Sequence, residues 1–154
     1  MKKAPLSLLF LFATSATWAQ GYTSVVDSHI INGTDVTHEY SDAVLTLDSE
    51  ETKVLNSYGD GYIPATVYEL EIKLNDAGGN HVETIVANDG AYAGGYAIYF
   101  DSAVFQHIPG MEFRVEYYQQ NSEDNSSVLT TLYFYDTDSD STDPYAVLEL
   151  SRML

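Results

Sequence analysis

Apolar and polar residues alternate one by one along most of the chain after its first twenty residues. The clearest case is residues 68–74, which read Tyr-Glu-Leu-Glu-Ile-Lys-Leu, and residues 96–100 and 113–117 repeat the pattern. A period of two places the apolar side chains on one face of a strand and the polar ones on the other. No stretch past residue 25 holds a helical apolar stripe over ten residues. The pattern therefore predicts an all-β domain.

Further strands are expected at residues 25–31, 43–48 and 82–87. Near the end of the chain, the alternation points these side chains inward: Val128, Thr130, Leu132 and Phe134, then Ala146, Leu148 and Leu150. Pairs such as Asn32-Gly33, Asp89-Gly90 and Pro109-Gly110 are expected to make turns between strands. Residues 74–82 are expected to form a hairpin. Short strands at this spacing favour an antiparallel two-sheet sandwich of about seven to nine strands.

Residues 108–117 read Ile-Pro-Gly-Met-Glu-Phe-Arg-Val-Glu-Tyr. This passage resembles the P-G-x-x-Y-x-V-x-V start of the sixth strand in fibronectin type III and related immunoglobulin-like sandwiches. Phe113 stands where that family has its corner tyrosine, and His107 stands where it has leucine. The resemblance implies an immunoglobulin-like topology, and adhesion or binding in place of catalysis.

The first nineteen residues have the features of a cleaved export signal. Lys2 and Lys3 precede an apolar run at residues 6–13, and small residues stand at Thr17 and Ala19, the positions that a signal peptidase reads. The run is shorter than the roughly 20 residues that a membrane span needs. We therefore expect a secreted protein, periplasmic or extracellular and of bacterial type, with one domain at residues 20–154.

Charge and composition exclude several functions. Loss of Lys2 and Lys3 with the signal changes the formal charge from −17 to −19, which disfavours nucleic acid and membrane insertion or binding. The chain has no cysteine, so it has neither a disulfide nor a thiolate zinc site. No nucleophile elbow, P-loop or zinc-protease motif is present. A non-catalytic protein is expected.

Residues 136–143 alternate aspartate with Ser and Thr. The carboxylates of a D-x-D-x-D-x-x-D run can converge on Ca²⁺, which takes six to eight oxygen ligands. Ser141 replaces the glycine of known calcium loops, and Val147 stands at the twelfth position in place of a bidentate glutamate. The alternative is a soluble hairpin loop. The metal ligands of a structural calcium site would be Asp136, Asp138, Asp140 and Asp143.

The chain has 13 tyrosines. Their rings supply contact area at low entropic cost, and they can also stack on sugars or simply pair across strands. Three, Tyr58, Tyr62 and Tyr92, stand in expected Gly-rich loops. The alternation points four outward as candidate ligand-binding residues: Tyr99, Tyr118, Tyr133 and Tyr135.

Residues 21–31 form a β-prone segment just after the expected cleavage point. This segment can pair within its own domain, or it can complete the sheet of a neighbouring subunit through Val25, Val26, Ile30 and Ile31. The leading hypothesis is a contact protein of an extracellular assembly, adhesion layer or matrix, which self-associates or binds another surface protein. The alternatives are a calcium-assisted carbohydrate-binding module and a small periplasmic enzyme or enzyme inhibitor, with residues 88–95 as the inhibitory loop.

Overall fold

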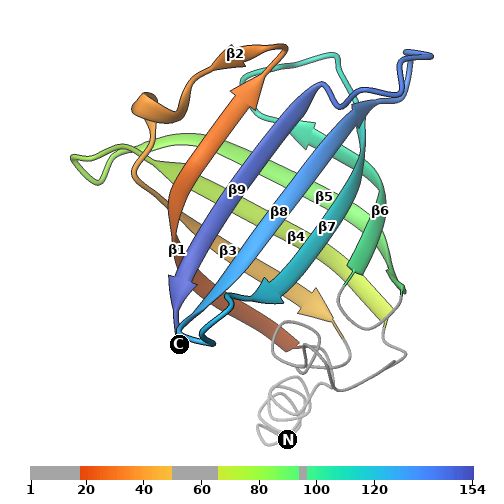
Figure 1. Cartoon of the computed structure of the whole chain (residues 1–154). Helices are drawn as coiled ribbons and strands as arrows, with labels where there is room; N and C mark the ends of the chain where they lie inside the picture. Colours follow the sequence, from red (N-terminus) through yellow and green to blue (C-terminus); the bar gives the residue numbers. More distant parts are fainter. Residues whose placement is uncertain (1–17, 50–65, 94–96) are drawn as a thin grey trace, which may run out of the picture.

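Most of the described residues form β-strands in the computed structural model, which describes residues 18–49, 66–93 and 97–154 (Figure 1). A single 3-10 turn, η1, interrupts them in the described residues. The elements are β1 Trp18–Ile31, β2 Thr34–Asp35, η1 Thr37–Glu39, β3 Asp42–Ser49, β4 Thr66–Asn75, β5 His81–Ala93, β6 Ala97–Phe105, β7 Phe113–Asn121, β8 Ser127–Asp136 and β9 Ala146–Met153.

The strands close into a barrel. From β3 to β9 each strand pairs antiparallel with the next one along the chain, and β1 pairs with both β3 and β9. The eight strands β1 and β3 to β9 thus make an up-and-down barrel, in which β2 is a short addition beside β1 (Figure 1). Closure gives most backbone donors and acceptors a partner on both sides.

The prediction of a two-sheet, immunoglobulin-like sandwich is wrong, although the prediction of strands throughout is confirmed. In a sandwich, strands leave one sheet and join another, whereas here every neighbour from β3 onward is consecutive in sequence. β1 pairs with β3 up to Val25 and with β9 from Val25 onward, and a bulge lies between Val26 and Ser28. A bulge bends and twists a strand, which lets β1 serve both neighbours.

The barrel is filled by apolar side chains from all eight strands. Phe105, Phe113 and Phe134 meet inside the barrel, with ring centroids 4.9 to 6.3 Å apart in edge-to-face contacts. Burying each large side chain contributes about 1.5–3 kcal/mol. The side chains predicted to point inward are buried: Val128, Thr130, Leu132, Phe134, Ala146, Leu148 and Leu150.

The two ends of the barrel differ. At the end beside η1, partly buried apolar side chains pack against the core: Ile31, Tyr40, Ile108, Met111 and Tyr145. The opposite end is the one where β1 begins and β9 finishes (Figure 1). Several inward positions there are polar. The barrel is therefore closed by apolar packing at one end and lined by polar groups at the other.

The predicted turns are mostly confirmed. Asn32 and Gly33 form the turn between β1 and β2 with φ of 49° and 78°, and the hairpin at residues 74–82 joins β4 to β5. The turn predicted at Asp89-Gly90 is wrong, because both residues lie within β5. Asp89 takes a φ of 57° inside that strand, so the Asp-Gly pair marks an irregular strand position there. Residues 88–93 belong to β5 and do not form the predicted loop.

The proposed signal peptide, residues 1–19, lies outside the described residues except for Trp18 and Ala19 at the start of β1. Within the ranges that the structure describes, no helix has the length and apolar character needed to cross a bilayer.

Candidate functional site

The four tyrosines predicted to face outward lie together on the outer face of three neighbouring strands. Tyr99 is on β6, Tyr118 on β7, and Tyr133 and Tyr135 on β8. The register places Glu116 of β7 opposite both Tyr99 and Tyr133. We call these four side chains the tyrosine strip.

The rings of the tyrosine strip contact one another across the strands. The centroids of Tyr99 and Tyr118 are 6.4 Å apart, and those of Tyr118 and Tyr133 are 5.9 Å apart. Both pairs are edge-to-face, with interplanar angles of 81° and 74°. Tyr135 continues the row beneath the guanidinium of Arg114, whose carbon lies 5.1 Å from the ring centroid. Such contacts fix the rings while leaving Tyr99 41% exposed.

Two hydroxyl groups of the strip, those of Tyr118 and Tyr135, have a raised pKa. The Tyr118 hydroxyl donates a hydrogen bond to Oε1 of Glu116 at 3.0 Å. A hydrogen bond with Tyr99 raises the pKa of Tyr118 most, and partial burial and the Glu116 carboxylate raise it further. Partial burial also raises the pKa of Tyr135. Tyr118 and Tyr135 therefore keep neutral hydroxyls beside the Glu116 carboxylate.

A groove of about 420 Å³ runs beside the strip on β7 and β8. Tyr118 and Tyr133 supply aromatic surface there, and Glu116, Gln120 and Thr131 supply hydrogen-bonding groups. The arrangement can stack on an apolar face and also bind hydroxyls at its rim.

The predicted calcium ligands lie in the connection between β8 and β9. Asp136 Oδ1 accepts a hydrogen bond from the Asp138 backbone N–H at 2.9 Å, which forms a local turn. The hydroxyls of Ser139 and Ser141 accept backbone N–H groups in the same way. In the described part of the chain, no three His, Asp or Glu side chains gather in a group that could hold a metal ion. Calcium binding by Asp136, Asp138, Asp140 and Asp143 stays a prediction from their spacing.

The predicted assembly segment is a strand of its own barrel. β1 pairs with β3 on one edge and with β9 on the other, so residues 21–31 do not project toward another subunit. Val26 points into the core and Ile31 packs against it, whereas Val25 and Ile30 are outward-facing and exposed. Within the described residues, the structure therefore does not show a strand that completes the sheet of a neighbouring subunit. Instead, the strand that contains Val25, Val26, Ile30 and Ile31 closes its own barrel.

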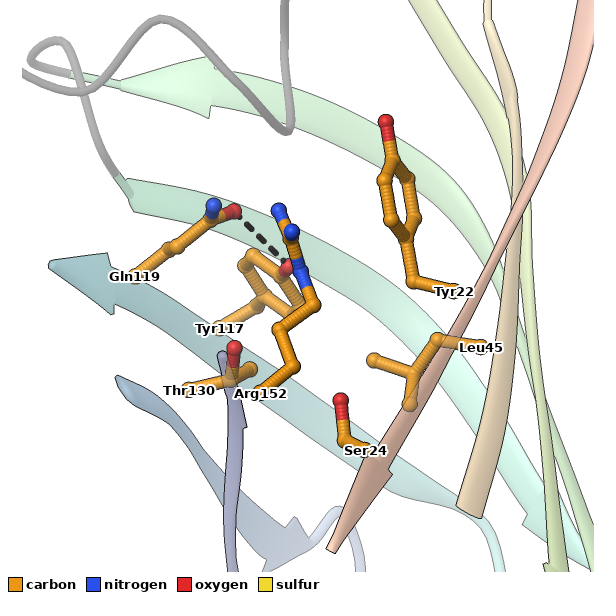
Figure 2. A pocket seen from close by; sticks show the side chains of 7 residues that line it. All are labelled: Tyr22, Ser24, Leu45, Tyr117, Gln119, Thr130 and Arg152. Carbon is orange, nitrogen blue, oxygen red and sulfur yellow. Dashed lines mark hydrogen bonds between the residues drawn. The ribbon is translucent and has the colours of Figure 1, made fainter. Parts of the chain in front are cut away.

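A polar pocket that we did not predict lies inside the barrel at its polar end. Figure 2 shows side chains from five strands converging there: Tyr22, Ser24, Leu45, Tyr117, Gln119, Thr130 and Arg152. The Tyr117 hydroxyl donates to Gln119 Oε1 at 3.1 Å, and burial raises the pKa of Tyr117, so this hydroxyl remains protonated. The Arg152 guanidinium lies over the Tyr22 ring, 4.4 Å from its centroid.

A signal for this pocket is present in the sequence. Ala146, Leu148 and Leu150 are alternate positions that are predicted to point inward, and Arg152 is the next position in that series. In the same way, Phe113, Val115 and Tyr117 lead to Gln119. A polar side chain that continues an inward-facing series at a strand end indicates a lined opening.

The three tyrosines that are expected in Gly-rich loops do not add to this site. Tyr58 and Tyr62 lie outside the described residues. Tyr92 belongs to β5 and not to a loop as predicted.

The chain matches no family model, no curated protein and no solved structure with which it was compared. Its function is therefore argued from the tyrosine strip and the polar pocket themselves.

Proposed function

We propose that this protein is a non-catalytic, exported adhesion protein that binds a polysaccharide through the tyrosine strip. The observation that carries the proposal is the gathering of Tyr99, Tyr118 and Tyr133 on three adjoining strands, with ring contacts of 5.9 and 6.4 Å. Adjacent strands lie about 4.8 Å apart, so the row spans roughly 10 Å, the length of two sugar units.

The chemistry of the groove fits a sugar chain. Ring faces pack against the C–H face of a pyranose, and aromatic rings lose little conformational entropy on binding. The Glu116 carboxylate accepts hydrogen bonds from sugar hydroxyls, while Gln120 and Thr131 can both donate and accept. Binding to a fixed barrel face needs no ordering of the backbone, which favours affinity.

The net charge restricts the kind of polysaccharide. A formal charge of −17 for the whole chain, and more once the proposed signal is removed, repels anionic polymers such as uronic acid chains. Neutral polymers are free of this penalty. The proposal is therefore a neutral polysaccharide at the cell surface or in the surrounding matrix, with residues 1–19 directing export.

The test uses the processed chain, residues 20–154, and measures its depletion from solution by insoluble cellulose, by chitin and by an alginate gel. We expect binding to at least one neutral polymer and none to alginate. Tyr118→Ala should weaken binding at least about tenfold, as for a central contact residue. The matched control is Val104→Ser, which changes an exposed outward residue of β6 away from the strip.

Two outcomes would overturn the proposal. The first is a wild-type chain that binds none of the polymers. The second is concentration-dependent self-association in sedimentation that Tyr118→Ala abolishes, which would assign the strip to assembly between copies of this chain.

A further inference from the structure

Two hollows meet at Arg152. The polar pocket lies inside the barrel, and a groove of about 680 Å³ lies on the outside along residues 21–25 of β1 and 151–153 of β9. Both are lined by Tyr22, Ser24 and Arg152. The β1–β9 ladder runs from Ile31 and Ala146 to Val25 and Ser151, so the groove opens where that ladder finishes. The interior is thus connected to the surface at this point.

The inner hollow has the side chains of an anion site. Ser24, Gln119 and Thr130 are only 5% to 7% exposed, yet all three carry hydrogen-bonding groups. Arg152 adds a permanently charged guanidinium with a planar set of N–H donors, which matches the two oxygens of a carboxylate. The Tyr22 ring supports the guanidinium from one side and fixes its orientation.

The sizes of the two hollows limit where each part of a ligand can lie. The free space in the polar pocket is about 10 Å³ for the centre of a water molecule, which is room for about one water. The outer groove is within the usual range of small-molecule sites, roughly 300–1,000 Å³. Its wall includes Val25 and Met153, which are 56% and 76% exposed. A carboxylate therefore lies at the mouth of the polar pocket, where Ser24 and Arg152 line both hollows, and an apolar tail lies in the outer groove.

We propose that this end of the barrel binds a small monocarboxylate with an apolar tail. The carboxylate binds the Arg152 guanidinium at the mouth of the polar pocket, with help from the hydroxyl of Ser24, because both residues also line the outer groove. The tail lies in the groove between β1 and β9 against Val25 and Met153. None of these residues belongs to the tyrosine strip, so the two proposals stand independently.

The experiment is calorimetric titration of the processed chain with sodium octanoate, with acetate and octan-1-ol as comparisons. Octanoate should bind, acetate should bind at least about tenfold more weakly for lack of a tail, and octanol should bind at least about tenfold more weakly for lack of charge. Amide chemical shifts of residues 21–25 and 151–153 should move with octanoate, which locates the site.

Arg152→Met should weaken octanoate binding at least about tenfold, because it removes a charge-assisted, two-pronged hydrogen bond. Arg114→Met is the matched control, since it removes the same charge from the outer face beside Tyr135. Arg152→Lys keeps the charge and should still lose affinity, which guards against a variant that fails to fold. Near-ultraviolet circular dichroism checks the fold of each.

Three results would overturn the inference: no heat and no shift with octanoate at millimolar concentration, equal binding of octanoate and octanol, or equal loss in the Arg152→Met and Arg114→Met variants. Polysaccharide binding by Arg152→Met and octanoate binding by Tyr118→Ala should both remain at wild-type level, so failure of one proposal is distinguishable from failure of the other.

Discussion

The hydroxyl of Tyr118 donates a hydrogen bond to Oε1 of Glu116, 3.0 Å away and two residues earlier on the outer face of β7. This bond joins the aromatic and acidic parts of the tyrosine strip. Because of this bond, removing the charge of Glu116 should change the ionisation of Tyr118.

The ionisation of Tyr118 provides the first prediction. Its pKa is raised above the ordinary value of about 10, first by the hydrogen bond with Tyr99 and then by burial and Glu116, so it stays protonated where free tyrosine ionises. Tyr99→Phe should lower the pKa of Tyr118, and Glu116→Gln should lower it as well. Tyrosinate absorbance during an alkaline titration measures this. Unchanged late ionisation in both variants would contradict the described contacts.

His29 provides the second prediction. It is fully buried, its Nδ1 lies 3.3 Å from the Val147 carbonyl oxygen, and its Nε2 has no hydrogen-bond partner in the described residues. Its ring contacts Tyr40 and Phe105, with centroids 5.2 and 6.5 Å away. Burial lowers the pKa of His29, although the Val147 carbonyl and Glu39 oppose the shift. The folded chain therefore holds this ring neutral.

The sign of the pH effect follows from linkage. Below about pH 6.5 the unfolded chain binds a proton at His29 more readily than the folded chain, so the free energy of unfolding falls as the pH decreases. His29→Phe should flatten this slope between about pH 7 and 5, above the range where carboxylates titrate. Urea unfolding at each pH measures it. Exposed His38→Gln is the control, and an unchanged slope in His29→Phe would contradict the account.

Two neighbouring residues of β8 provide the third prediction. Phe134 is fully buried between Phe105 and Phe113, whereas Tyr135 lies on the outer face. Phe134→Ala should lower the free energy of unfolding by about 3–5 kcal/mol, because it leaves a cavity. Tyr135→Ala should cost about 1 kcal/mol or less, as expected for an exposed cross-strand contact. Chemical denaturation measures both free energies of unfolding. A larger loss for Tyr135→Ala than for Phe134→Ala would contradict the placement of Phe134 inside the barrel and Tyr135 on its outer face.

The alternation in the sequence was sufficient to predict the strands and their buried faces. Leu132 and Phe134 point inward and Tyr133 and Tyr135 outward, as predicted, because a strand's side chains alternate whatever it pairs with. The outward tyrosines could be predicted for the same reason. Their gathering on one face could not, because it depends on β6, β7 and β8 being neighbours.

Closure of the sheet was not predictable from the pattern. A sandwich and a barrel have the same alternation, and they differ in which strand edges meet across long distances in sequence. Here the difference is the pairing of β1 with β9, more than one hundred residues apart, and the bulge after Val26 that allows it. Arg152 and Gln119 line the same pocket only because the barrel closes.

The barrel depends on β1 lying between β3 and β9, and engineered disulfides test this directly because the chain has no cysteine. Opposed residues of antiparallel strands have Cα atoms about 4.5–5.5 Å apart, within reach of a disulfide. The outward pairs are Ile30 with Val147 for β1–β9 and Thr23 with Val44 for β1–β3. The control pair, Val44 with Val147, is separated by β1. Intact mass and non-reducing gels after mild oxidation should show both test pairs linked within one chain and the control unlinked. Failure of the Ile30–Val147 pair to link while the Thr23–Val44 pair links would show an open sheet and contradict the barrel.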